Sequence, residues 1–401
     1  MTRIERAAKH LGMTNKTRLA NQLLAIKKRI TDKIEEAPQC FVGFDGFTDE
    51  IIDAVETRTG PHDYQAMTEM RQFGQRINEF AGKSCNIELV VRQKKIGGNA
   101  PILTNALLEG GHRITFAGAI GKKEKIEPLF QEMADRCKRV FPLCPSGHSD
   151  ALEFHDGKVI LGKHASLIDI NFSTLIKHIG KETLIQLLDE TDLFVSANWT
   201  MLPLMTEIWH RIDEEIVPSL SPRSNERPRW LFVDLADPAK RTDSDMLEGL
   251  QALKRLSKAF RTILGLNAAE AIRVGDVLSS PFAHDGDSAH MRKLAQDIYQ
   301  RSGLYEIIIH ATHYAVAANE QEMIFVQGPY TGSPILATGA GDNFNAGVCN
   351  ALLYQLSTED ALLSGVGTSG FYVRYAKSPT ISELGSFLKT WEVHPEELIH
   401  E

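Results

Sequence analysis

The turn from Gly339 to Asp342 places three small residues and a carboxylate just ahead of an apolar stretch at helical spacing. This pattern predicts a tight turn that leads directly into a helix. The first amides of a helix have no internal partner, so together with the helix dipole they favour an anion such as a phosphoryl group. Asp342 could then accept the proton of an attacking hydroxyl while the amides hold the phosphoryl oxygens. Taken alone, the same residues also fit a glycine-rich turn with an acidic helix cap.

Asn267 and Glu270 form a second group with possible chemistry, directly after the apolar run 262–265. At the start of a helix, this spacing directs both side chains toward the carboxyl end of the preceding strand. An amide and a carboxylate there can hold magnesium through its waters, beside the phosphates of a nucleotide. The same two residues also suit an asparagine cap with a first-turn glutamate. Both interpretations stay open at this point.

Two aspartates and a Gly-Gly-Asn sequence could bind a polyol. Asp45 and Asp49 follow the first apolar run, and a carboxylate there can accept hydrogen bonds from two vicinal sugar hydroxyls. Asp49 is the stronger candidate, because Asp45 is close enough to the strand to tie down the turn instead. Gly97 and Gly98 would let the backbone lie against a flat sugar, while Asn99 offers a donor and an acceptor.

Short apolar runs that alternate with helical patterns must position these residues. Such runs predict a mostly parallel sheet with helices on both faces, which is an α/β fold. In open α/β sheets the ligand lies beyond the carboxyl ends of the strands. The runs cover 40–43, 114–118, 193–196, 230–234, 262–265 and 307–310. Polar residues that end or follow the runs, and so are expected on the ligand edge, include Asn198, Asp234, Asp237, His310 and Thr312.

Two segments interrupt the alternating pattern, at about 55–95 and 149–168. The first is polar and mixed, and the second places Asp156 and Gly157 between strand-like runs, which is a strong hairpin signal. Together they predict a small β-strand lid over the ligand edge.

Residues 1–38 form a separate basic segment, with nine Lys or Arg residues against four Asp or Glu residues. Apolar residues at helical spacing predict a helical extension with one packed face. Residues 7–19 also have the small-residue and Leu-Gly pattern of a helix-turn-helix. Short patterns of this kind often arise by chance, and a helical arm on the main domain explains the same residues.

The composition narrows the class of protein. The chain has 401 residues and a net charge of −8, so it has no overall basic field for nucleic acid. Its five cysteines include no CxxC pair and indicate neither a disulfide framework nor a zinc site. No run approaches the ~20 apolar residues that cross a bilayer, and the first residues lack a signal-peptide core. We expect a cytoplasmic protein with small-molecule partners, no membrane and no nucleic acid.

Two stretches resemble the signatures of the ribokinase-like (phosphofructokinase-B type) carbohydrate kinase family. Residues 97–121 resemble the N-terminal signature, and residues 338–347 resemble the more specific C-terminal one. Between them, Asn267 and Glu270 match the family's Asn-x-x-Glu motif. The resemblance extends from about residue 39 to the C-terminus. It implies one kinase domain over 39–401, with a ribokinase-like three-layer fold and a small strand lid.

The resemblance also implies an activity. A sugar kinase of this kind transfers the γ-phosphoryl group of ATP to a hydroxyl of a carbohydrate or nucleoside-like substrate, with Mg²⁺. Asp342 would be the general base, and the amides of Gly339, Ala340 and Gly341 would form the anion site.

The remaining site residues follow from the same resemblance. Glu270 and Asn267 would organise the metal, through its waters. The implied nucleotide contacts are Asn267, Thr312, Thr338, Gly339 and Gly341. The implied sugar contacts are Asp49, Gly97 and Gly98, with Asp45 and Asn99 as further candidates.

Departures from the family pattern define the alternatives. Leu336 and Ala337 replace the acidic lead-in that the family carries before Thr338, so we do not expect activation by a monovalent cation. The sequence around Asp45 and Asp49 also resembles ADP-dependent sugar kinases of the same superfamily. A sugar-sensing regulator, with residues 1–38 on DNA, is an alternative from another class. Pairing of lids into a homodimer and the identity of the sugar stay open.

Overall fold

A mostly parallel sheet runs through the main body of the molecule. The computed structural model describes residues 14–32, 36–122, 125–283 and 287–395. Within these ranges the sheet has nine strands in the order β16-β15-β14-β13-β12-β11-β1-β5-β8. The seven strands from β14 to β8 are parallel to one another, whereas β15 is antiparallel to both β14 and β16. The strands are β1 (Gln39–Phe44), β5 (Arg113–Gly118), β8 (Arg139–Pro142), β11 (Leu193–Ser196), β12 (Trp230–Asp234), β13 (Arg261–Asn267), β14 (Glu306–His310), β15 (Tyr314–Asn319) and β16 (Met323–Gln327).

Six of the parallel strands correspond to the apolar runs in the sequence, because a strand covered on both faces is apolar at nearly every position. Phe41 of β1 belongs to the core on one face, and Val42 belongs to the core on the other. Strands β8, β15 and β16 were not predicted. The two edge strands, β8 and β16, begin with the exposed residues Arg139 and Met323, and neither has a long apolar run.

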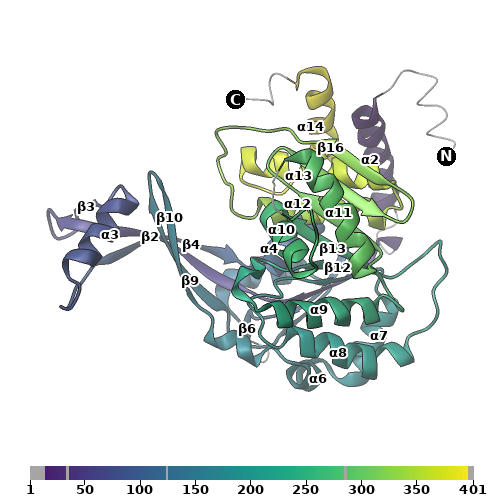
Figure 1. Cartoon of the computed structure of the whole chain (residues 1–401), viewed down its shortest axis with the longest axis horizontal. Helices are drawn as coiled ribbons and strands as arrows, with labels where there is room; N and C mark the ends of the chain where they lie inside the picture. Colours follow the sequence, from purple (N-terminus) through teal and green to yellow (C-terminus); the bar gives the residue numbers. More distant parts are fainter. Residues whose placement is uncertain (1–13, 33–35, 123–124, 284–286, 396–401) are drawn as a thin grey trace.

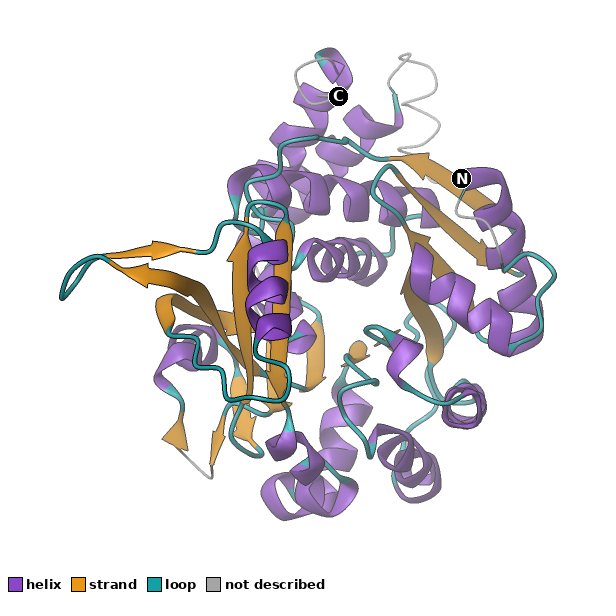
Figure 2. Ribbon diagram, turned by 60° about the vertical axis from the view of Figure 1, so that its left-hand side comes forward, coloured by secondary structure: helices purple, strands orange, loops and turns teal. Residues whose placement is uncertain are grey.

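Helices cover both faces of this sheet (Figure 2), so the predicted three-layer α/β fold is confirmed. One layer contains α2 (Asn15–Asp32), α4 (Asn99–Glu109), α5 (Gln131–Arg136), α12 (Ala340–Leu353), α13 (Thr358–Tyr375) and α14 (Ile381–Val393). The other contains α6 (Phe172–Ile179), α7 (Lys181–Glu190), α8 (Met205–Glu215), α9 (Asp243–Leu256), α10 (Ala268–Val277) and α11 (Ser288–Ser302). Among the described residues, no helix is both long enough and apolar enough to cross a bilayer.

A second, smaller sheet projects from the main body (Figure 1). Its strands are β2 (Phe47–Arg58), β3 (Tyr64–Ala66), β4 (Leu89–Gly97), β9 (Gly147–Phe154) and β10 (Gly157–Lys163), and α3 (Met70–Glu79) lies beside β3. A separate short pair joins β6 (Gly121–Lys122) to β7 (Lys125–Ile126). Both segments predicted to form a lid contribute strands to this smaller sheet, which we call the lid. It begins at Phe47 and not near residue 55, and β9 begins at Gly147 and not at 149. The polar run from Thr48 to Glu50 hid the start of β2 in the sequence.

Helix α2 packs on the main body through an apolar face. Leu19 and Leu23 are buried in the same core as residues of α14, and Arg18 forms an ion pair with Asp360 at 2.8 Å. This is the packed helical arm expected for the basic segment. Most of the helix-turn-helix pattern at 7–19 lies outside the described residues.

Candidate active site

The glycine-rich turn lies at the N-terminus of α12, as its sequence predicts. Gly339 caps the helix with a φ of +93°, and a Cβ atom there would come within 2.8 Å of the hydroxyl of Tyr372. The amide of Ala340 donates to Ala337 at 3.1 Å, but those of Gly341 and Asp342 have no acceptor among the described residues. The turn therefore offers free N–H groups at the positive end of a helix, where an anion is stabilised.

A cavity of about 480 Å³ adjoins this turn. Ala340 and Gly341 form part of its wall, and the predicted nucleotide contacts Asn267 and Thr312 lie in the same wall. Thr338 is outside the lining but immediately precedes the turn. The other lining residues are Ala268, Ala269, His310, Ala311, Gly328, Pro329, Tyr330, Thr331, Pro334, Ala337, Phe344, Val366, Ser369, Gly370 and Val373. This mostly apolar wall with a few polar groups suits a planar base and its attached phosphates.

Asp342 belongs to a group of acidic side chains that are buried near one another. Burial and the charges of Asp234 and Asp45 raise the pKa of Asp342 well above its usual range, and a hydrogen bond from Asn99 opposes the shift. Glu270 contributes a further repulsive charge. The Oδ1 atom of Asp342 is buried without a hydrogen-bond partner. A buried carboxylate oxygen with no partner is unfavourable unless a ligand supplies one.

Asp234 is a member of this group for which no role was predicted, although its place at the end of a strand was recognised. Its carboxylate accepts hydrogen bonds from the amide of Ala236 at 2.9 Å and from the side chain of Asn345 at 2.7 Å. Burial, followed by the charge of Glu270, raises the pKa of Asp234 to about 8. Asn345 was also missed, because it lies inside an apolar helical pattern where nothing marks it as different from its neighbours.

Asp45 is held by the main body. It accepts hydrogen bonds from the amides of Asn99 and Ala100, at 2.9 and 2.8 Å, and from the side chain of Asn198 at 2.6 Å. Burial raises the pKa of Asp45 to about 6, against these hydrogen bonds. Asp45 thus fixes the start of α4 and the end of β11, which leaves Asp49 as the better placed of the two predicted sugar contacts.

Asn267 and Glu270 form a complete capping box at the start of α10. The Asn267 side chain accepts from the Glu270 amide at 2.9 Å, and the Glu270 carboxylate accepts from the Asn267 amide at 2.8 Å. The amide of Asp237 donates to the other Glu270 oxygen at 3.2 Å. An ionised carboxylate has about four lone-pair sites, so the cap leaves Glu270 able to accept hydrogen bonds from metal-bound water. The two interpretations of this motif are therefore compatible.

Asp49 approaches the site from the lid, on β2 opposite Lys95 of β4. Its carboxylate lies against Gly97, where an added Cβ would be 2.3 Å from Oδ2. Burial raises the pKa of Asp49, while a hydrogen bond from Ser149 and the charges of Lys95 and Lys158 oppose the shift. The glycine therefore provides the room that the Asp49 carboxylate occupies.

The acidic group fits a divalent cation. Asp45, Asp234, Glu270 and Asp342 are all buried, and the wall of the adjoining cavity includes no Lys or Arg. Carboxylate oxygens, with water, are the ligands that Mg²⁺ prefers. The partnerless Oδ1 of Asp342 and the mutual repulsion of the acids are the features that a bound cation would relieve.

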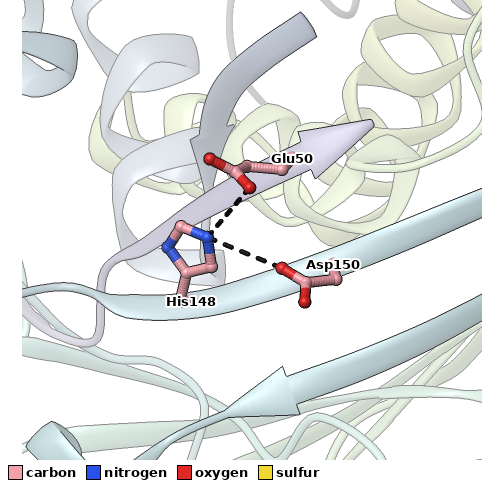
Figure 3. Close-up of side chains that lie close together, drawn as sticks. All are labelled: Glu50, His148 and Asp150. Carbon is pink, nitrogen blue, oxygen red and sulfur yellow. Dashed lines mark ion pairs between the residues drawn. The ribbon is translucent and has the colours of Figure 1, made fainter. Parts of the chain in front are cut away.

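A second charged cluster lies on the other face of the lid. The Nε2 atom of His148 is 3.3 Å from Glu50 and 3.6 Å from Asp150, on neighbouring strands (Figure 3). Lys94 forms an ion pair with Glu50 at 2.6 Å, and Lys163 forms one with Asp150 at 2.9 Å. Each carboxylate thus already has a cationic partner, so this cluster ties the strands of the lid together.

Comparisons with known proteins find carbohydrate kinases. A family model described as prokaryotic ketohexokinase matches residues 15–391. A ketohexokinase of Haloferax volcanii is 26% identical over 350 residues, which cover 86% of this chain and 89% of that protein.

Solved structures share the fold at low sequence identity. Ribokinase from Thermotoga maritima has a TM-score of 0.58 at 16% identity, over 88% of this chain and 99% of that one. Arabidopsis thaliana ribokinase, complexed with ribose and ATP, has a TM-score of 0.59 at 14% identity over the same shares.

These matches confirm the resemblance to ribokinase-like carbohydrate kinases. The protein is a sugar kinase, a phosphotransferase that acts on a sugar hydroxyl. Because the family model covers most of its length, the chain belongs to the prokaryotic ketohexokinase family.

Proposed function

We propose that this kinase transfers the γ-phosphoryl group of ATP to a hydroxyl of a ketohexose, with Mg²⁺ and with Asp342 as the general base. The observation that carries the proposal is the buried, partnerless Oδ1 of Asp342 beside the free amides that begin α12. A proton acceptor and an anion site are thereby next to each other, as in-line phosphoryl transfer requires.

The chain's own residues supply the main steps. The acceptor hydroxyl donates its hydrogen bond to Asp342, and its oxygen attacks the γ-phosphorus. The new O–P bond forms as the bond to the bridging oxygen breaks, so that ADP leaves and the proton stays on Asp342. The amides of Gly341 and Asp342 stabilise the negative charge of the phosphoryl oxygens during the transfer.

Asp234, Glu270 and Asn267 are the residues that would hold Mg²⁺, largely through its waters. When bound, the metal neutralises the charge that develops between the β- and γ-phosphates. Positive charge at this place also lowers the pKa of the neighbouring acids. Asp342, whose pKa is raised by burial and by Asp234, would then lose its proton and become a competent base.

The proposed identities of the phosphoryl donor and of the acceptor sugar rest on different arguments. The complete Thr-Gly-Ala-Gly-Asp sequence at 338–342 favours ATP, because ADP-dependent relatives generally lack it. The ketohexose acceptor follows from the family model and from the name of the Haloferax protein. Asp49, from the lid, and Asn99, from the start of α4, are the proposed sugar contacts.

The test is an assay of the purified full-length protein against ketohexoses, aldohexoses, pentoses and nucleosides, each with Mg²⁺ and either ATP or ADP. We expect a ketohexose to react fastest, with ATP and not ADP as the donor. The Asp342→Asn variant should lose at least ~100-fold in kcat with little change in the KM for sugar, because it lacks only the proton acceptor. Full activity of this variant would reject Asp342 as the base, and activity only with ADP would reject the donor.

A further inference from the structure

The phosphates of a nucleotide need more positive charge than the main body provides. The wall of the cavity contains no Lys or Arg, and its lining residue Gly341 directly precedes the buried acid Asp342, on which the charges of Asp234 and Glu270 also act. One divalent ion and the amides at the start of α12 oppose only part of the charge of a triphosphate. A cation that approaches from outside the main body would complete the site.

Lys158 of the lid is in this position. Its ammonium donates to the Thr338 hydroxyl at 2.7 Å, one residue before the turn that caps α12. Strand register places Lys158 opposite Glu153, and Ser149 opposite Asp49, so Lys158 and Asp49 lie on the same face of the lid. Its charge also acts on the Asp49 carboxylate. Lys158 therefore lies between the proposed sugar contact and the phosphate turn.

We propose that Lys158 binds the γ-phosphoryl group of ATP and follows it to the sugar, and that the segment containing β3 and α3 positions this lysine. The proposal rests on the function proposed above for the acceptor, but its nucleotide contact can be measured without sugar. Lys158 would exchange its hydrogen bond with Thr338 for phosphoryl oxygens. A charged donor on an anionic oxygen forms a short, strong hydrogen bond.

The segment containing β3 and α3 reaches the hairpin that carries Lys158. The carboxylate of Asp156, in the hairpin turn, accepts a hydrogen bond from the amide of Met70 at the start of α3, at 2.8 Å. The amide of His155 donates to the carbonyl of Thr68 at 2.7 Å. The rings of Phe73 and Phe154 pack at 5.8 Å, and α3 lies beside the hairpin in Figure 1. These contacts hold the hairpin turn two residues from Lys158.

The experiment compares Lys158→Met with Lys163→Met. Both residues are exposed and lie on β10, but Lys163 is on the opposite face and pairs with Asp150. Binding of ATP and of ADP, each with Mg²⁺ and no sugar, is measured by calorimetry, and kcat and KM are measured with the best sugar. We expect Lys158→Met to weaken ATP binding about 10-fold and ADP binding less than about twofold, since one charged hydrogen bond to the γ-phosphate is lost. Its kcat should fall at least about 10-fold, with the sugar KM unchanged.

Each result bears on the proposal. Lys163→Met should match the wild type in nucleotide binding. Equal losses for ATP and ADP, or a raised sugar KM with normal kcat, would overturn the role of Lys158 at the γ-phosphate. If the wild type phosphorylates no sugar, the proposed function fails, but a selective loss of ATP affinity in Lys158→Met would still support the lysine contact.

Asp156 tests the positioning role. Asp156→Ala removes the acceptor for the Met70 amide. It should lower kcat about threefold, because the hairpin would then hold Lys158 less firmly. The sugar KM should not change. Asp156→Asn keeps an acceptor oxygen and should restore kcat. Normal kcat in Asp156→Ala, or failure of Asp156→Asn to restore it, would show that the segment containing β3 and α3 does not position Lys158.

Discussion

Two clusters of charged side chains in this protein differ in how their charges are balanced. On the outer face of the lid, Glu50 and Asp150 each have a lysine partner within 3 Å. At the carboxyl edge of the main sheet, Asp45, Asp234, Glu270 and Asp342 are buried together, and burial raises the pKa of each of them. The first cluster stabilises the lid by itself. The second is stable as charged groups only with a cation, which is why we assign chemistry to it.

After Asp342, the comparison predicts its largest effect at Glu270. The Glu270→Gln variant keeps a capping side chain but lacks the negative charge, so it should bind Mg²⁺ with ATP more weakly and lose about 10- to 100-fold in kcat, within the range for metal-site mutations. Titration of activity with Mg²⁺ checks this, and excess metal should restore part of the loss.

Glu306→Gln is the matched control. Glu306 is also a buried acid, with a pKa of about 7 raised by burial, but it begins β14 at the opposite edge of the sheet. We expect the Glu306→Gln variant to have the activity and the Mg²⁺ dependence of the wild type. A similar loss in both variants would mean that burial, and not position, causes the effect.

Gly339 gives an intermediate effect. Gly339→Ala should cost about 1 to 2 kcal/mol of stability, because a Cβ is strained at positive φ and would crowd Tyr372. It should also lower kcat by disturbing the anion site. Gly82→Ala has a similar φ of +79° and open space around the added atom. Gly82→Ala should lower the free energy of unfolding, as measured by chemical denaturation, and leave kcat unchanged. A normal kcat in Gly339→Ala would contradict the anion site.

The pH dependence of stability should differ between the wild type and Asp234→Asn. The folded pKa of Asp234 is about 8 and its ordinary value is 3.8, so the folded state holds a proton that the unfolded state has lost between these values. Over this range Asp234 is ionised in the unfolded chain but protonated in the folded state. The free energy of unfolding therefore falls as the pH rises from about 4 to 8. Asp234→Asn should be more stable than the metal-free wild type at pH 8, and the difference should shrink toward pH 4. A constant difference over this range would show that Asp234 does not titrate as described.

The lid cluster gives the smallest effect. Glu50→Gln removes a partly exposed charge that already has partners, so it should change stability by less than about 1 kcal/mol and leave kcat within about twofold. Thermal unfolding and the standard assay check both values. A large loss of activity would show that the lid cluster is part of the active site, and the two regions would then not differ in function.

Much of the fold and part of the site follow from sequence pattern. Continuous apolar runs gave the parallel strands, and the residues after them, including Asn267 and Asp234, lie at one edge as the chain topology requires. The turn at Gly339 was predictable because its conformation needs glycine. The contact of Lys158 with Thr338 joins residues 180 positions apart, and local periodicity carries no information about it. The start of β2 was missed because Thr48, Asp49 and Glu50 face polar and charged partners and not a core.

The most direct test of the central claim is the number of protons released when ATP and Mg²⁺ bind. Calorimetric titration at pH 7 in two buffers with different ionisation enthalpies gives this number for the wild type and for Asp342→Asn. If a bound cation frees Asp342 and its neighbours to ionise, the wild type releases protons on binding and Asp342→Asn releases fewer. Equal heats in both buffers would show that the acids do not gain charge on binding and would contradict Asp342 as a base activated by the metal.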